Sequence, residues 1–254
     1  MRAAGRDGHV TDTDSPDVCV VGGGPAGLTA GLFTARAGLE TVLIDAGDPI
    51  LERNAHLENV PGFPAGVDSR LFLEMLRDQA QRNGVNRRGG RVTRIERADD
   101  ELVVECDVDE PLTADWVVCA SWPDIDYLAG LDAVEFLERG SKTYVDVGED
   151  GWTGVPGLYA AGRIAGTRHQ TVVAAGDAAD VALAVVEASD VPYYHDWVVP
   201  EGYFTERGRE VPPGCVEVDA AERRALASES RSVVREYFTD PHPDEPTQHP
   251  SLRE

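Results

Sequence analysis

A glycine-rich turn near the start of the chain carries the clearest chemical signal. Gly22, Gly24 and Gly27 form a G-x-G-x-x-G pattern at the end of the apolar run "DVCVVG". The first glycine allows a tight turn, the second lets the backbone approach a diphosphate, and the third lets a helix pack on a strand. Backbone amides at the start of that helix would then face the phosphates. The pattern predicts dinucleotide binding and assigns no catalytic residue.

An acidic residue stands where such a site needs one. Asp45 ends the next apolar run, "ETVLID", 23 residues after Gly22, close to the spacing of roughly 20 at which a carboxylate bonds a ribose hydroxyl. The helical pattern between the two apolar runs completes a strand, helix, strand unit, which needs a parallel sheet. The alternative is a glycine-rich turn in an α/β core that binds nothing. The loop alone does not separate FAD from NAD.

The elements that follow extend this unit into an α/β fold. A helix is predicted behind the candidate N-caps Asp68 and Ser69, ending at Gly84. Segment 90–121 alternates short β-rich runs with turns, which predicts a small antiparallel excursion that returns to the main sheet. An alanine-rich helix is predicted over 169–189. The expected fold is a Rossmann-like FAD/NAD(P)-binding domain with a parallel central sheet and a C-terminal extension.

Composition changes along the chain suggest three parts. Residues 1–16 are polar and expected to be disordered. Residues 17–188 would form the FAD/NAD(P)-binding domain. From residue 189 to 254 we expect a C-terminal extension that begins with an aromatic, proline-rich stretch, contains one helix and ends in a polar tail.

Charge excludes some classes of partner. The chain has 23 basic and 46 acidic residues, a net charge of -23, which repels nucleic acid and anionic membrane surfaces. Lys142 is the only lysine, and an acidic, lysine-poor chain suggests adaptation to high salt. No apolar run is long enough to cross a bilayer, and the first residues lack a secretory signal. A cytoplasmic protein is expected.

The four cysteines show neither a C-x-x-C pair nor the spacing of metal ligands, so no metal site is predicted. Cys19 and Cys119 lie inside apolar runs and are expected to be packing residues, and Cys106 lies in a strand-like segment. Cys215 has loop-like neighbours and is interpreted as a surface thiol. His242 and His249 lie in the polar tail and are not expected to bind metal.

Five motifs in order carry a family resemblance. They are "VVGGGPAGLTAGLFTARAG", "ENVPGFPAG", "LFLEMLRDQAQRNGV", "VPGLYAAGR" and "HQTVVAAGDAADVA". Over residues 16 to 188 this order resembles the FAD-binding portion of the low-molecular-weight thioredoxin reductases. In that family the first loop binds the FAD diphosphate, the second motif lies along the flavin, and the last two close over the ribityl chain and isoalloxazine. The resemblance implies FAD as cofactor and contacts from Gly22, Gly24, Pro25, Ala26, Gly27, Asp45, Asn59, Pro61, Gly62, Gly162, Arg163, His169 and Gln170.

The chain departs from the family in three ways. The stretch from Ser121 to Val155 is too short for the NADPH-binding domain that the family inserts there. The redox C-x-x-C pair of that domain is missing with it, so exchange with thioredoxin is not supported. Arg163 stands where the family has an aspartate that bonds the ribityl chain, and His169 replaces the usual arginine. Two interpretations are open: Arg163 pairs with the diphosphate, or the flavin end of the site has lost its function.

The strand end also differs, because Ser121 and Trp122 replace the usual "TG". Trp122 is interpreted as a core or lid aromatic, with coverage of an adenine or isoalloxazine face as the alternative.

These features predict an FAD-dependent oxidoreductase whose catalytic residues are unknown. Its electron donor would be NAD(P)H docking transiently at the flavin, or a protein such as ferredoxin, and its acceptor a small molecule or a protein. A dinucleotide-binding regulatory protein without catalysis is the alternative that Arg163 and Trp122 favour. A non-redox enzyme resembling thiazole synthases is ranked last, because no second glycine-rich segment follows Asp45. The resemblance also implies a homodimer.

Overall fold

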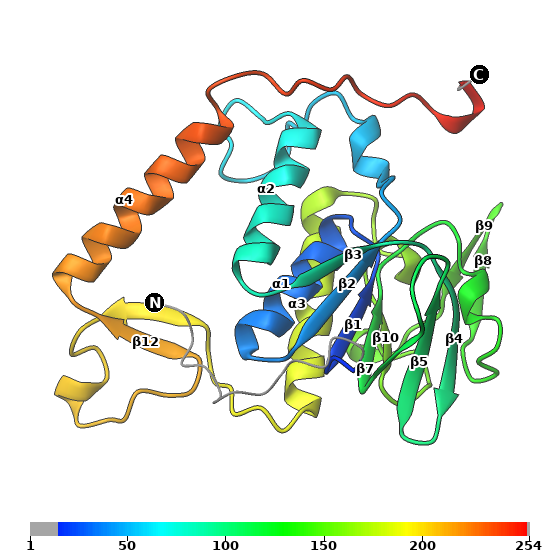
Figure 1. The fold of residues 1–254 in the computed structure, drawn as a ribbon, viewed down its shortest axis with the longest axis horizontal. Coiled ribbons are helices and arrows are strands. Elements are labelled where there is room, and N and C mark those ends of the chain that lie inside the picture. The colour runs from blue at the N-terminus through cyan, green and yellow to red at the C-terminus, as the bar shows by residue number, and fades with distance from the viewer. Residues whose placement is uncertain (1–14, 253–254) are drawn as a thin grey trace.

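A five-stranded parallel sheet forms the centre of the molecule. The computed structural model describes residues 15–252, so the disorder expected for residues 1–16 falls almost entirely outside the described residues. The strand order is β10-β7-β1-β2-β3, and every neighbouring pair is parallel (Figure 1). The strands are β1 (Val18–Val21), β2 (Thr41–Asp45), β3 (Asn86–Gly89), β7 (Trp116–Cys119) and β10 (Leu158–Ala160). The predicted parallel α/β fold is confirmed.

Two layers of buried side chains cover the sheet, one on each face. On one face Val18 and Val20 pack against α1 (Pro25–Ala37), α2 (Ser69–Arg82) and α3 (Thr171–Ala188). On the other face Cys19 and Val21 pack against an antiparallel sheet of β4 (Val92–Ala98), β5 (Glu101–Cys106) and β6 (Leu112–Ala114). Successive side chains of a strand point to opposite faces, so a continuous apolar run such as β1 is buried on both.

The antiparallel excursion returns to the main sheet through β7, as predicted. Between β7 and β10 the chain forms an antiparallel hairpin of β8 (Phe136–Arg139) and β9 (Lys142–Val145). The strand, helix, strand unit of a second nucleotide-binding domain is not formed in this described stretch, which agrees with the length of the segment. Single 3-10 turns occur at η1 (Ile50–Arg53), η2 (Asp126–Leu128), η3 (Glu149–Gly151), η4 (Gly162–Ala165), η5 (Thr205–Arg207) and η6 (Pro250–Leu252).

Local sequence signals explain where the helices begin and end. Pro25 opens α1, where its missing N–H costs nothing, and Gly38 closes it with a φ of 102°. Asp68 is the N-cap of α2 and accepts hydrogen bonds from the backbone N–H groups of Arg70 (2.9 Å) and Leu71 (3.2 Å). Of the two caps considered for this helix, Asp68 is therefore the one used.

The C-terminal extension (residues 189–252) differs from the body (residues 15–188) in how it is built. It contains a parallel pair, β11 (Trp197–Pro200) and β12 (Cys215–Val218), followed by α4 (Ala220–Tyr237). Figure 1 shows α4 set apart from the helices of the body, while the chain after it runs back past the end of α2. There Thr247 N–H donates to the carbonyl of Glu52 (3.0 Å). The helix was predicted, but the strand pair was not.

One interpretation of a cysteine was wrong. Cys215 is buried, not a surface thiol, because it begins β12 opposite Trp197 and its Sγ donates to the carbonyl oxygen of His195 (3.5 Å). Cys19 and Cys119 are buried packing residues as predicted, and burial raises the pKa of Cys119 to about 12. No group of metal-ligating side chains is present among residues 15–252, and no helix there is long and apolar enough to span a membrane.

Candidate functional site

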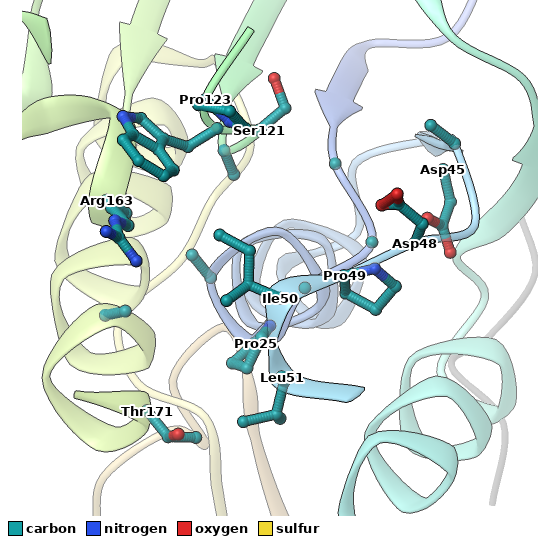
Figure 2. Close-up of a pocket in the computed structure, with 18 of the residues that line it drawn as sticks. Pro25, Asp45, Asp48, Pro49, Ile50, Leu51, Ser121, Pro123, Arg163 and Thr171 are labelled. Atoms are coloured by element: carbon teal, nitrogen blue, oxygen red, sulfur yellow. The ribbon is translucent and has the colours of Figure 1, made fainter. Parts of the chain in front are cut away.

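A cavity of about 870 Å³ opens at the carboxyl ends of β1, β2 and β7. The strand order changes direction at β1, with β2 on one side and β7 on the other. Ligands of open α/β sheets bind at such a position. Figure 2 shows Pro25 at the start of α1 facing the cavity, with Asp45 on one side and Arg163 on the other.

The glycine turn lies between β1 and α1 and lines this cavity. Gly22 donates to the carbonyl of Ile44 (2.8 Å), which fixes the turn against β2. A side chain on Gly24 would meet nothing within 4 Å, so its Cα faces open space. No side chain caps the N-terminus of α1, and its first turn contains no acidic residue. The backbone amides here are therefore available to an anion.

Gly27 has a different role from Gly24. A Cβ atom on Gly27 would lie 1.8 Å from the carbonyl oxygen of Gly22, and Gly27 does not line the cavity. Its lack of a side chain lets α1 approach the turn. Gly24 therefore keeps space open for a ligand, whereas Gly27 permits helix packing.

Asp45 presents an unused acceptor to the cavity. Its Oδ1 accepts a hydrogen bond from Gly47 N–H (2.9 Å). Its Oδ2 is buried without a hydrogen bond, although Arg87 Nε lies at 3.4 Å and Arg77 at 4.0 Å. The carboxylate sits against Gly23, where a Cβ atom would lie 2.1 Å from the carboxyl carbon. A buried acceptor without a hydrogen bond is costly, and a ligand hydroxyl would supply one.

The opposite end of the cavity carries stacked cationic and aromatic groups. The guanidinium of Arg163 lies over the Trp122 ring, 3.9 Å from its centroid, and donates to His169 Nε2 (2.8 Å). Burial and the charges of Arg163 and Lys142 lower the pKa of His169, so His169 accepts this bond as a neutral ring. Trp122 is half-buried, and its Nε1 is buried without a hydrogen bond. Trp122 lines the cavity, which is compatible with the expected lid and with coverage of a ring system.

Two predicted residues from distant motifs meet at the mouth of the cavity. Asn59 Nδ2 donates to Gln170 Oε1 (2.6 Å), and both residues are exposed. Gln170 is the N-cap position of α3, which therefore begins beside the cavity, as Thr171 in Figure 2 indicates. The structure thus brings the "ENVPGF" segment and the start of α3 together.

Most of the predicted site residues line the cavity. These are Gly22, Gly24, Pro25, Ala26, Asp45, Asn59, Arg163, His169 and Gln170.

The other four predicted residues do not line it. Besides Gly27, Gly162 is buried with its N–H donating to Asp177 (2.6 Å), and Pro61 and Gly62 lie in a separate shallow groove. Sequence reasoning also missed a lining residue, Arg53. It lies in an irregular proline- and glycine-rich segment, where periodicity gives no signal.

Comparison with known proteins finds similarity to thioredoxin reductases. Residues 16–121 match the family described as pyridine nucleotide-disulphide oxidoreductase. Thioredoxin reductase of Pneumocystis jirovecii is 34% identical over 113 residues, which cover 41% of this chain and 35% of that protein. Thioredoxin reductase of Listeria monocytogenes is 44% identical over 62 residues, covering 24% of this chain and 19% of that protein. The chain therefore spans about a third or less of the length of these curated relatives.

Solved structures resemble the fold over a longer range. The structure of a thioredoxin reductase from Gloeobacter violaceus aligns with a TM-score of 0.59 at 20% identity, covering 72% of this chain and 99% of that one. At this identity the likeness concerns the fold. None of these comparisons favours the regulatory or the thiazole synthase-like alternative.

Proposed function

We propose that the chain is an FAD-dependent oxidoreductase, as its similarity to the pyridine nucleotide-disulphide oxidoreductase family and to thioredoxin reductases supports. The observation that carries this proposal is the match between the cavity and a dinucleotide. Gly24 leaves open space beside the uncapped start of α1, and Asp45 has a buried carboxylate oxygen without a hydrogen bond. A diphosphate and a ribose hydroxyl are the groups that these two features accept.

In this proposal the chain's residues bind and orient the cofactor. The turn from Gly22 to Pro25 holds the diphosphate, Asp45 holds the adenosine ribose, and Asn59 with Gln170 borders the flavin end. FAD, when bound, supplies the hydride or electron transfer. The positive end of α3, at Gln170, would stabilise negative charge at that end of the cavity.

The electron donor is proposed to come from outside this stretch of chain. The hairpin between β7 and β10 occupies the place where the family carries its nucleotide domain. NAD(P)H docking transiently, or a small redox protein, would therefore reduce the flavin. The acceptor would not be reduced through a dithiol of Cys19 and Cys119, because both are buried and burial raises their pKa values.

A change at Gly24 tests the binding site. Gly24→Val should raise the Kd for FAD by at least about tenfold, because the new side chain fills the diphosphate space. Far-UV circular dichroism should stay unchanged, since the backbone φ of Gly24 is -84° and no atom lies in the way. Gly176→Val in α3 is the matched control, because this glycine also has open space but does not line the cavity.

Absorbance and turnover then test the activity. The protein reconstituted with FAD should show flavin absorbance bands and reduce dichlorophenolindophenol with NADPH, NADH or reduced ferredoxin. A protein that takes up no FAD would refute the cofactor assignment. Bound FAD that none of these donors reduces would refute the oxidoreductase assignment.

The homodimer is also a proposal. Val198 and Val216 are paired across β11 and β12, and both are about half exposed (55% and 48%). We propose that this apolar pair widens a contact between two copies of the chain. Light scattering should then show a smaller particle for Val198→Glu than for the unchanged protein, and equal sizes would refute this role. A cytoplasmic location remains an expectation from the sequence.

A further inference from the structure

The charged side chains around the cavity are not all neutralised. Arg91 lines the cavity and pairs with Asp124 (3.8 Å between nitrogen and oxygen). Arg53 and Arg163 also line the cavity, yet neither has a carboxylate within 4.0 Å in the part of the chain that the structure describes. This is unexpected in a chain whose acidic residues outnumber its basic ones by 46 to 23.

Both arginines are partly shielded from water. Two other shielded arginines, Arg70 and Arg77, each pair with a carboxylate. Burial lowers the pKa of Arg163, and the nearby charge of Arg53 lowers it further. Two like charges that share a shielded cavity repel each other, and shielding removes the hydration that would compensate. An anion between them would relieve both costs.

Arg163 is fixed in position before any ligand arrives. Its guanidinium lies over Trp122 at 3.9 Å and donates to His169 at 2.8 Å. Figure 2 shows Arg163 on the wall of the cavity that faces the segment carrying Ile50 and Leu51. That segment is η1, which ends at Arg53. Arg53 and Arg163 therefore line the cavity from two different elements, η1 and η4.

We propose that Arg53 and Arg163 form an anion clamp that binds a phosphate or carboxylate group of a ligand in the cavity. A guanidinium offers forked N–H donors whose geometry matches an oxyanion. The anion comes from one of two sources: the diphosphate of FAD, or the acidic group of a separate small-molecule substrate. The clamp rests on the proposed function only where FAD is used to identify the source of the anion.

The first step uses the full chain freed of bound nucleotide and titrated with inorganic diphosphate in a calorimeter. Ionic strength is held constant, because salt screens exposed charges. Arg53→Gln and Arg163→Gln should each weaken diphosphate binding about tenfold. Arg163→Lys should weaken it less, since it keeps the charge but loses the fork. Arg139→Gln is the matched control, because Arg139 is exposed, lies over Tyr144 and does not line the cavity.

Thermal unfolding separates a clamp from a structural role. Without ligand, Arg53→Gln should unfold at the same or a higher temperature than the unchanged protein, because it removes a repulsion. A structural arginine would leave a less stable protein when replaced. Unchanged diphosphate affinity in both glutamine variants would refute the clamp, as would an unchanged protein that binds no diphosphate.

The second step identifies the source of the anion. If FAD blocks diphosphate binding and both variants weaken FAD binding by the same factor, the clamp holds the cofactor. If the FAD-loaded protein still binds diphosphate and depends on both arginines, the clamp holds a separate anionic substrate. The two proposals can fail separately. A protein that binds diphosphate but no FAD would support the clamp and refute the proposed function. A protein that binds FAD but no diphosphate would refute the clamp and leave the proposed function standing.

Discussion

The parallel sheet of the body lies between two layers of buried apolar side chains, whereas none of the 18 residues of α4 in the C-terminal extension is buried. Partly buried apolar side chains such as Tyr193 and Tyr237 pack the extension against the body, together with polar contacts such as the bond from Arg36 on α1 to Asp196 (2.6 Å). Within the extension, Glu217 on β12 accepts bonds from the loop at 202–205. Apolar burial is insensitive to pH, but charged hydrogen bonds are not. The cavity is therefore lined by the apolar body, and the loop that Glu217 holds within the extension is the part that a change of pH should open.

The largest expected effect concerns helix packing in the body. Gly27→Ala should destabilise the protein by about 3 kcal/mol or more, because its Cβ would lie 1.8 Å from a backbone oxygen that cannot rotate away. Gly24→Ala, the same change three residues earlier, should alter stability by less than about 0.5 kcal/mol. Urea unfolding measures both. Equal destabilisation by the two variants would contradict the division of roles within the turn.

A pair of leucines compares the two regions directly. Leu28 on α1 is 1% exposed, and Leu226 on α4 is 42% exposed. Leu28→Ala should cost roughly 2–5 kcal/mol through lost burial and a cavity. Leu226→Ala should change the free energy of unfolding by less than about 0.5 kcal/mol. A large loss at Leu226 would show that α4 is covered by another copy of the chain in solution, which repeating the measurement at lower protein concentration would test.

The sequence predicts the body better than the extension for a physical reason. The turn at Gly22 to Gly27, the cap at Asp68 and the apolar runs of the sheet are local signals, because each element's conformation is encoded in adjacent residues. The strands β11 and β12 are short and pair in parallel across an intervening loop, so no local pattern specifies their partnership. The same pairing buries Cys215, whose proline and glycine neighbours suggested a surface loop.

Within the site, the sequence indicates residues whose place depends on backbone chemistry, but it does not indicate which side chains of distant segments meet at the cavity. Gly24 and Asp45 follow from what a diphosphate and a ribose require. The positions of Arg53 and Trp122 at the cavity depend on how irregular segments fold back. The contact between Arg163 and Trp122, for example, joins residues 41 positions apart. The suggested adaptation to high salt stays a prediction, because no contact within the chain tests it.

Acid should open the loop at residues 202–205 of the extension before it unfolds the body. Glu217 is half-buried, which alone would raise its pKa, but hydrogen bonds from Phe204, Thr205 and Gly202 outweigh this and lower the pKa to about 2. A carboxylate with a lowered pKa contributes its full stabilisation above its ordinary value of 4.5, and loses it as the pH falls from there towards 2.

Hydrogen exchange of residues 200–208 should therefore accelerate between pH 4.5 and 2 relative to the intrinsic rate, while α1 stays protected. In Glu217→Gln the same amides should be less protected at neutral pH and lose most of this acid dependence, since a neutral amide offers one acceptor oxygen in place of two. The centre of the body's sheet needs no ionised group of this kind, because β1, β2 and β7 are buried on both faces. Simultaneous loss of protection in α1 and in residues 200–208 would mean that the two regions unfold as one unit.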